Sequence, residues 1–304
     1  MSIDFLKKLE NELKREKATA ERTEALVRIG IKLKAYEGDD KIVSSEELSE
    51  MIDSEPEPFR IMSKINKLDA IVDGFRGGQL IILAAAKKSG KTTFSMQLTE
   101  SMREHNPCWF PFEQGGEELV RQFKDKKMKI PFFYLPAKND KKDQKWIEER
   151  MLEAIVKFDT KIFFIDNFDW IDKPRNNDRF DIAVGDVLMW IKAFAIKWNV
   201  TILLMAHITK LEDDVPPTSN DIRDSSRFGQ MADLVLILWR KVRKEKVEGT
   251  NSKVLIKTNK TLLNVAENRR NGKTGYVQLN FKDDRYTEEQ WDEALESNQH
   301  ETDF

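Results

Sequence analysis

Short apolar runs alternate along most of the chain with longer stretches whose apolar residues recur at helical spacing. The runs occupy residues 79–86, 107–113, 161–171, 200–207 and 232–239. Each is rich in consecutive apolar or β-branched residues, which is typical of strands buried on both faces. Amphipathic stretches such as 92–103 and 181–199 lie between them. This alternation predicts the α/β class: a mostly parallel, twisted sheet with helices on both faces.

The N-terminal part of the chain has a different pattern. Residues 1–40 place single apolar residues among dense mixed charges, as in an amphipathic helix with one apolar stripe. We predict either a charged helical hairpin that packs on the main body or an arm for oligomerisation or partner docking. Residues 41–58 follow as a linker, in which Ser44 and Ser45 are candidate N-caps of a short helix before a Glu- and Pro-rich end.

The main domain is assigned to residues 59–287. Beyond residue 253 the pattern alternates around an Asn-Gly pair, Asn271 and Gly272, which predicts a closing antiparallel hairpin. Residues 288–304 are acidic and lack Lys and Arg, so they are predicted to be a disordered tail.

Composition narrows the function classes. Lys and Arg number 51 against 53 Asp and Glu, a formal net charge of −2, so a nucleic-acid-binding surface must be a local patch. The single cysteine, Cys108, cannot form an internal disulfide, and no apolar run approaches the roughly 20 residues that span a bilayer. The N-terminus has no secretory signal pattern either. We therefore expect a cytoplasmic protein that does not engage a membrane.

The residues after the first apolar run are of the types that bind phosphate. A phosphate-binding loop needs a tight turn whose N–H groups wrap phosphate oxygens, a lysine for the β and γ phosphates, and a hydroxyl for Mg²⁺. Lys91 and Thr92 meet the last two needs, between a predicted strand and a predicted helix. The predicted nucleotide-binding residues are Lys87, Lys88, Ser89, Gly90, Lys91, Thr92 and Thr93.

Three further candidate side chains each come after several apolar residues within a run. Asp166 is a candidate for the metal's water shell, with Asp169 as the surface alternative. Glu113 is a candidate to polarise an attacking water, or else an acid that interacts with a helix dipole. His207 could sense a γ phosphate or be structural. Residue types and spacing leave these alternatives open.

Five segments together resemble, in order, the motor domain of DnaB-type replicative helicases. They are LDAIVDGFRGGQLIILAAAKKSGKTTF, WFPFEQGGEELVRQF, IFFIDNFDWI, TSNDIRDSSRFGQMADLVLILWR and ENRRNGKTG. The resemblance covers about residues 42–287 and rests most on the DIRDSS stretch. It implies a RecA-like P-loop NTPase, assembled as a hexameric ring around single-stranded DNA, that binds ATP and Mg²⁺ between subunits.

The resemblance also implies residue roles. Glu113 matches the catalytic glutamate, Asp166 the metal-shell acid, and Arg270 the arginine that reaches the neighbouring subunit's phosphate. His207 falls where cellular members carry glutamine and phage relatives carry histidine. Asn268 replaces a usual lysine, so one trans contact is absent or has moved to Arg269.

DNA contacts are expected in two loops. The DIRDSS stretch supplies Arg223, Asp224 and Ser226, with Ser226 in place of a usual glycine. The loop after Asp166 adds cations that could bind the DNA backbone or be ordinary solvated surface. These cations are Lys173, Arg175 and Arg179.

The resemblance favours a phage or mobile-element helicase without the N-terminal collar or a primase domain. Such a protein would translocate 5′ to 3′ in replication, with a primase, loader or other replisome proteins as partners. Its compartment would be the cytoplasm of a bacterial host. Two alternatives are a RecA-like DNA-dependent ATPase that assists recombination or loading without unwinding, and a nucleotide-gated assembly protein without DNA work. The adenine of the nucleotide could stack on Phe281 or on Tyr286.

Overall fold

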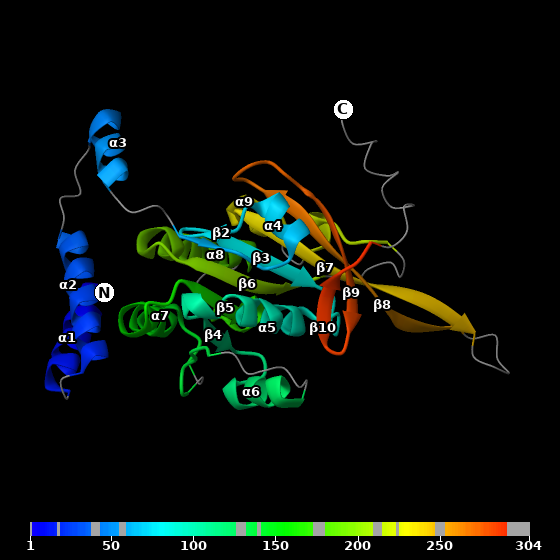
Figure 1. Ribbon diagram of the computed structural model, residues 1–304, viewed down its shortest axis with the longest axis horizontal. Coiled ribbons are helices and arrows are strands. Elements are labelled where there is room, and N and C mark those ends of the chain that lie inside the picture. Colours follow the sequence, from blue (N-terminus) through cyan, green and yellow to red (C-terminus); the bar gives the residue numbers. More distant parts are fainter. Residues whose placement is uncertain are drawn as a thin grey trace.

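The centre of the molecule is an eight-stranded sheet in the order β10-β9-β8-β7-β3-β6-β5-β4 (Figure 1). The computed structural model describes residues 2–16, 19–37, 43–54, 59–125, 132–138, 141–172, 180–208, 215–222, 225–246 and 253–290. The strands at one side of the sheet are β3 (Leu80–Ala85), β4 (Cys108–Pro111), β5 (Ile162–Asp166), β6 (Thr201–His207) and β7 (Leu234–Lys246). They pair in parallel, as the five apolar runs predict.

The other side of the sheet is antiparallel. It consists of β8 (Lys253–Asn268), β9 (Gly275–Lys282) and β10 (Arg285–Glu288), with β8 paired to β7. The predicted hairpin around Asn271 and Gly272 is therefore confirmed as β8 and β9. The pairing of β7 with β8 continues to Lys246 and Lys253, well past the apolar run. Backbone hydrogen bonds can hold such a ribbon without an apolar pattern, so hydrophobicity does not predict its length.

Two strand ends differ from the ends of the sequence patterns. The run 161–171 contains only the short strand β5, and a 3₁₀ turn, η2 (Phe168–Trp170), follows it. Glu288 is not the first residue of a tail, because it ends β10 opposite Leu279, and its carboxylate accepts from the Lys67 N–H at 2.5 Å. Residues 291–304, most of the predicted disordered tail, lie outside the described residues.

Helices cover both faces of the sheet. Successive side chains of each strand point to opposite faces, so both faces are apolar and each forms a core with the helices that cover it. Leu80 and Ile82 of β3 enter the core beneath α7 (Gln144–Phe158) and α8 (Phe180–Trp198). Ile81 and Leu83 enter the opposite core. That second face is covered by α4 (Asn66–Val72), α5 (Lys91–Ser101) and α6 (Gly116–Asp125). The expected α/β architecture is confirmed.

The N-terminal helices α1 (Ser2–Arg15) and α2 (Ala20–Glu37) pack on α7. Leu6, Leu9 and Ile29 are buried in the same core as the sheet. Arg28 also donates from Nε to the Val156 carbonyl at 2.6 Å, near the C-terminal end of α7. Such a contact satisfies a carbonyl that the helix itself cannot. The hairpin thus belongs to the main body.

The linker contains α3 (Ser45–Ser54), which stands apart from the sheet in Figure 1. Ser44 and Glu47 form a reciprocal capping box, with Glu47 N to Ser44 Oγ at 3.1 Å and Ser44 N to Glu47 Oε2 at 2.8 Å. Ser44 is therefore the N-cap. Leu48 and Ile52 are exposed on this helix.

Small elements complete the fold. They are β1 (Arg60–Ile61), β2 (Phe75–Arg76), η1 (Arg103–His105), η3 (Ser219–Asp221) and α9 (Ser225–Met231). β1 and β2 pair with each other, and their Ile61 and Phe75 side chains lie in the same core cluster as Leu68 and Val72 of α4. Within the described ranges, no helix has the length and apolarity needed to cross a membrane.

Candidate functional site

The phosphate-binding sequence forms a turn between β3 and α5. Ser89 N donates to the Ala86 carbonyl at 3.2 Å, and Lys88 and Gly90 have φ angles of 59° and 90°. Two features require glycine at position 90. Its φ angle is left-handed, and a Cβ atom there would lie 2.0 Å from the Tyr286 hydroxyl oxygen. No side chain caps α5, so its first N–H groups are available to an anion.

Lys91 begins α5 and is buried. Its Nζ donates to the Ala206 carbonyl at 3.3 Å. Burial lowers the pKa of the ammonium, while the Asp166 and Glu113 carboxylates act in the opposite direction. A buried cation at the mouth of a phosphate loop is a strong binder of phosphate oxygens because water screens it little.

Thr92 and Asp166 form a pair of oxygen ligands. Thr92 Oγ1 donates to Asp166 Oδ2 at 3.1 Å. Asp166 Oδ1 is buried with no hydrogen-bond partner, and burial raises the pKa of this carboxyl group. A hydroxyl and a carboxylate with a spare oxygen fit Mg²⁺. Among the described residues, no group of three or more His, Cys, Asp or Glu side chains is placed to hold a metal ion by itself.

Asn167 joins the two remaining candidates, Glu113 and His207. Its Nδ2 donates to Glu113 Oε2 at 2.5 Å and to His207 Nε2 at 3.0 Å, while its Oδ1 accepts from Asp169 N at 2.9 Å. The backbone bond to Asp169 fixes which way the amide points. His207 Nε2 is then the acceptor, and the imidazole proton resides on Nδ1.

The charge of His207 follows from its surroundings. Burial and the Lys91 ammonium lower the pKa of the imidazole, so it is neutral near pH 7. Glu113 lies in the turn two residues after β4 and is not part of the strand, and 45% of its side chain is exposed. A carboxylate that is held by an amide yet open to solvent can meet a water molecule.

Sequence reasoning missed Asn167. Its position directly after the apolar strand β5 was a usable signal, because side chains at the carboxyl ends of parallel strands meet at one edge of a sheet. A search for acidic residues alone does not identify the Asn167 amide, which connects Glu113 with His207.

The phosphate loop, Glu113, Asp166 and His207 line one cleft of about 650 Å³. Arg240 and Phe281, from β7 and β9, form its other wall, with the guanidinium carbon 4.5 Å from the ring centre. Tyr286 is buried, and its hydroxyl donates to the Gly90 carbonyl at 3.3 Å. Of the two aromatic candidates for base stacking, Phe281 is therefore the one that borders the cleft.

Arg270 lies at the opposite edge of the sheet. Strand β7 runs parallel to β3, with Leu234 opposite Ile81, and Asn268 pairs with Leu234. The turn after β8 is thus at the amino ends of the parallel strands, whereas the phosphate loop follows their carboxyl ends. Six strand residues at about 3.3 Å each separate the two edges. Arg270 does not line the cleft of its own chain.

The neighbours of Arg270 have structural contacts. Asn268 is buried, and its Nδ2 donates to Asn271 Oδ1 at 2.7 Å within the turn. Arg269 Nη2 donates to the Gly229 and Gln230 carbonyls at 2.8 and 2.6 Å, at the end of α9. The structure therefore does not support the idea that a trans contact moved from Asn268 to Arg269.

Most of the expected DNA contacts fall outside the described residues. These are Lys173, Arg175, Arg179, Arg223 and Asp224. Ser226 lies in the first turn of α9, and its side chain is also outside them.

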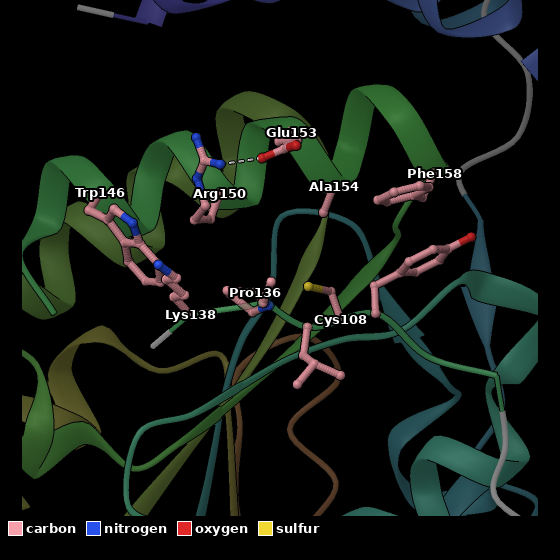
Figure 2. A pocket seen from close by; sticks show the side chains of 11 residues that line it. Cys108, Pro136, Lys138, Trp146, Arg150, Glu153, Ala154 and Phe158 are labelled. Atoms are coloured by element: carbon pink, nitrogen blue, oxygen red, sulfur yellow. Dashed lines mark hydrogen bonds and ion pairs between the residues drawn. The ribbon is translucent and has the colours of Figure 1, made fainter. Parts of the chain in front are cut away.

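A second hollow, of about 480 Å³, lies between residues 134–138 and α7 (Figure 2). Its walls include Cys108 and Trp146, and Arg150 pairs with Glu153 at its rim at 2.5 Å. Burial raises the pKa of the Cys108 thiol, which disfavours the nucleophilic thiolate form.

Comparisons with known proteins show the family to which the chain is similar. Residues 60–154 and 139–288 match the family model described as the DnaB-like helicase C terminal domain. The replicative DNA helicase DnaB of Rickettsia prowazekii (strain Madrid E) is 24% identical over 266 residues, covering 70% of this chain and 54% of that protein. The DnaB of Mycoplasma genitalium (strain ATCC 33530 / DSM 19775 / NCTC 10195 / G37) is 23% identical over 254 residues, covering 72% and 53%. The chain spans about half the length of the curated relatives it matches.

Two solved structures share the fold. One is a DnaB-like replicative helicase described with its interactions with primase, which has a TM-score of 0.64 and 16% identity and covers 95% of this chain and 76% of that one. The other is an isolated ATPase domain, which has a TM-score of 0.64 and 17% identity and covers 82% of this chain and 100% of that one. The sheet, the RecA-like fold of these neighbours and the family match agree with the resemblance seen in the sequence. This chain belongs to the DnaB-like helicase C-terminal domain family.

Proposed function

We propose that this chain is an ATP-dependent DNA helicase motor that works as a ring of identical subunits on single-stranded DNA. The observation that carries the proposal is the division of groups between two edges of one sheet. Lys91, Thr92, Asp166 and Glu113 lie around one cleft, and Arg270 lies a strand length away. Such a chain needs a second copy to complete a phosphate-transfer site.

Each group in the cleft has a chemical role in the proposed reaction. Lys91 and the N-terminal N–H groups of α5 bind the β and γ phosphates. Thr92 and Asp166 would hold Mg²⁺, which would neutralise charge on those phosphate oxygens.

Glu113 takes the proton from the water that attacks the γ phosphorus, and the bond to the departing ADP oxygen breaks. Asn167 keeps the Glu113 carboxylate in place and links it to neutral His207, which can report the presence of the γ phosphate. Arg270 of an adjoining subunit stabilises the charge on the transferring group.

The DNA side of the proposal comes from the resemblance. Arg223, Asp224 and Ser226, with Lys173, Arg175 and Arg179, are proposed to contact the strand in the ring's channel. Arg223→Ala should then weaken binding to all single strands and lower the salt dependence by about one phosphate contact. If the salt dependence of DNA affinity did not change, Arg223 would not be a DNA-contacting residue of the channel.

The finer proposal is a hexamer that moves 5′ to 3′ in the replication of a phage or mobile element, with a primase or loader as partner. It is tested by ATP turnover with and without single-stranded DNA. It is also tested by strand displacement on duplexes that carry a single-stranded tail at either the 5′ or the 3′ end. We expect DNA-stimulated turnover and unwinding only with a 5′ tail, both absent in Lys91→Ala. Turnover without displacement on either duplex would contradict the helicase.

One observation favours an alternative, a RecA-like DNA-dependent ATPase that acts as a recombination or loading accessory. Asn268 occupies the usual lysine position and is used inside its own turn. A second trans contact to the phosphate is therefore not supplied from this position. Stimulated turnover without strand separation is the result that this alternative predicts.

A further inference from the structure

Asp73 is the meeting point of three guanidinium groups. Arg60 Nη1 lies 2.7 Å from its Oδ1, and Arg76 Nη2 lies 2.9 Å from its Oδ2. Arg270 Nη2 lies 3.0 Å from the same Oδ2, and Arg270 Nη1 donates to the Asp73 carbonyl oxygen at 3.4 Å. Arg270 is thus held through two of its nitrogens by a single residue.

The residue that holds Arg270 is itself firmly placed. Asp73 caps the C-terminus of α4 with a left-handed φ of 56°, and its N–H donates to the Asp69 carbonyl at 2.8 Å. The turn that carries Arg270 is tied to the same helix end, since Asn271 Nδ2 donates to the Ile71 carbonyl at 3.0 Å. Arg270 and Asp73 are therefore both tied to the C-terminal end of α4.

The charges around Asp73 leave Arg270 able to bind an anion. One carboxylate faces three cations, so the cluster stays net positive. The neighbouring Arg76 and Arg270 groups lower the pKa of Asp73, which keeps it ionised. A guanidinium has five N–H donors in a rigid fork, and a contact on one edge orients the others. About a third of the Arg270 side chain is exposed, at 34%.

We infer that Asp73 is a positioning residue that orients Arg270 for the nucleotide bound by an adjoining subunit. The inference rests on the proposed function, in which Arg270 acts in trans. Its physical basis is entropy: a free arginine has many rotamers, whereas one held at two points loses less freedom when it meets the phosphate.

The test separates the chain that offers Arg270 from the chain that binds ATP. Lys91→Ala subunits keep Arg270 but cannot hold phosphate, and Arg270→Ala subunits keep the cleft. Mixing the two should restore part of the turnover that each lacks. Asp73→Asn is then placed in one partner or the other. Asparagine has nearly the same shape and tolerates a left-handed φ, so the capping geometry is kept.

We expect Asp73→Asn to lower kcat by roughly tenfold when it is in the Lys91→Ala partner, with the KM for ATP within about twofold. In the Arg270→Ala partner it should change neither. Glu100→Gln is the matched control, because Glu100 also holds an arginine, Arg285, through two hydrogen bonds of 2.8 and 3.2 Å. That control should have no effect in either partner.

The outcomes are distinguishable. If mixing restores no ATP turnover, the hypothesis of a site shared between subunits is wrong, and the proposed ring is wrong with it. That result does not depend on the role of Asp73. If mixing restores turnover and Asp73→Asn has no effect, or lowers both arrangements equally, Asp73 does not position Arg270. Faster turnover with Asp73→Asn in the Lys91→Ala partner would make Asp73 a restraint and would overturn the inference.

Discussion

The two edges of the parallel sheet differ in how complete they are. At the carboxyl edge, the loop after β3, the turn after β4, and the ends of β5 and β6 bring Lys91, Glu113, Asp166 and His207 around one cleft. At the amino edge, Arg270 is held by Asp73 and borders no nucleotide cleft of its own chain. One chain therefore gathers these candidate groups around one cleft and holds Arg270 about a strand length away from it.

This difference has a geometric cause. All parallel strands end at the same edge, so every loop that follows a strand can contribute to one site. An antiparallel strand such as β8 returns the chain to the opposite edge. In the proposed function, an arginine at that edge acts on the nucleotide bound by another copy of the chain.

The largest expected effect comes from the carboxyl edge. Lys91→Ala should abolish ATP binding and turnover, since it removes the buried cation that faces the phosphates. Glu113→Gln should lower turnover about 10²- to 10⁴-fold while ATP still binds, because only proton transfer is lost. Filter binding and phosphate release measure the two steps. Glu118→Gln, an exposed acid at the start of α6, is the control, and near-normal turnover in Glu113→Gln would refute its role.

Next in size is the amino edge. Arg270→Ala should fold and bind nucleotide but lose about 10³-fold or more in turnover, as loss of a trans arginine does in related chemistry. Adding this variant to wild-type protein should depress turnover more than dilution predicts. A strictly proportional fall would mean that the subunits do not share sites. Arg269→Ala offers a neighbouring comparison, because its side chain contacts α9 and is expected to affect turnover much less.

A smaller effect is expected at the link within the cleft. Asn167→Ala should lower kcat by about 10- to 100-fold and leave ATP affinity nearly unchanged, since it frees Glu113 and His207 without touching Lys91. Steady-state kinetics separate kcat from KM. If KM rises and kcat does not fall, Asn167 helps to bind substrate and does not orient Glu113.

The smallest effect concerns pH. The folded state lowers the pKa of His207 below its ordinary 6.5, so the unfolded chain takes up this proton first as the solution is acidified. Above pH 6.5 the imidazole is neutral in both states and does not lower the free energy of unfolding. Below that pH, protonation of His207 in the unfolded chain lowers the free energy of unfolding. The melting temperature of wild type should drop more between about pH 7.5 and 5.5 than that of His207→Gln. Equal drops would show that this imidazole is not held neutral.

Much of the fold could be predicted from the order of residues alone. Buried parallel strands need near-continuous apolar runs, so the five strands and the α/β class are visible as a pattern. The capping box at Ser44 is equally local, as is the Asn-Gly turn at Asn271. The residue types around Lys91 and Thr92 likewise indicated a phosphate loop, because its chemistry depends on neighbours in sequence.

Other features depended on contacts between distant segments. The extent of the β7–β8 ribbon is set by backbone pairing, which leaves no mark in hydrophobicity. Asn167 joins Glu113 and His207 across 54 and 40 positions of sequence, and Tyr286 reaches Gly90 across 196. Such partners become neighbours only when the strands take their places in the sheet.

The sequence by itself determined the elements, the phosphate loop and the family, because each is written in short stretches whose physics is local. Tertiary structure alone decided that Arg270 faces away from its own cleft and rests on Asp73, a residue 197 positions earlier. The physical reason is the direction of the strands: sequence specifies which residues form β8, but only the assembled sheet specifies the edge at which β8 ends.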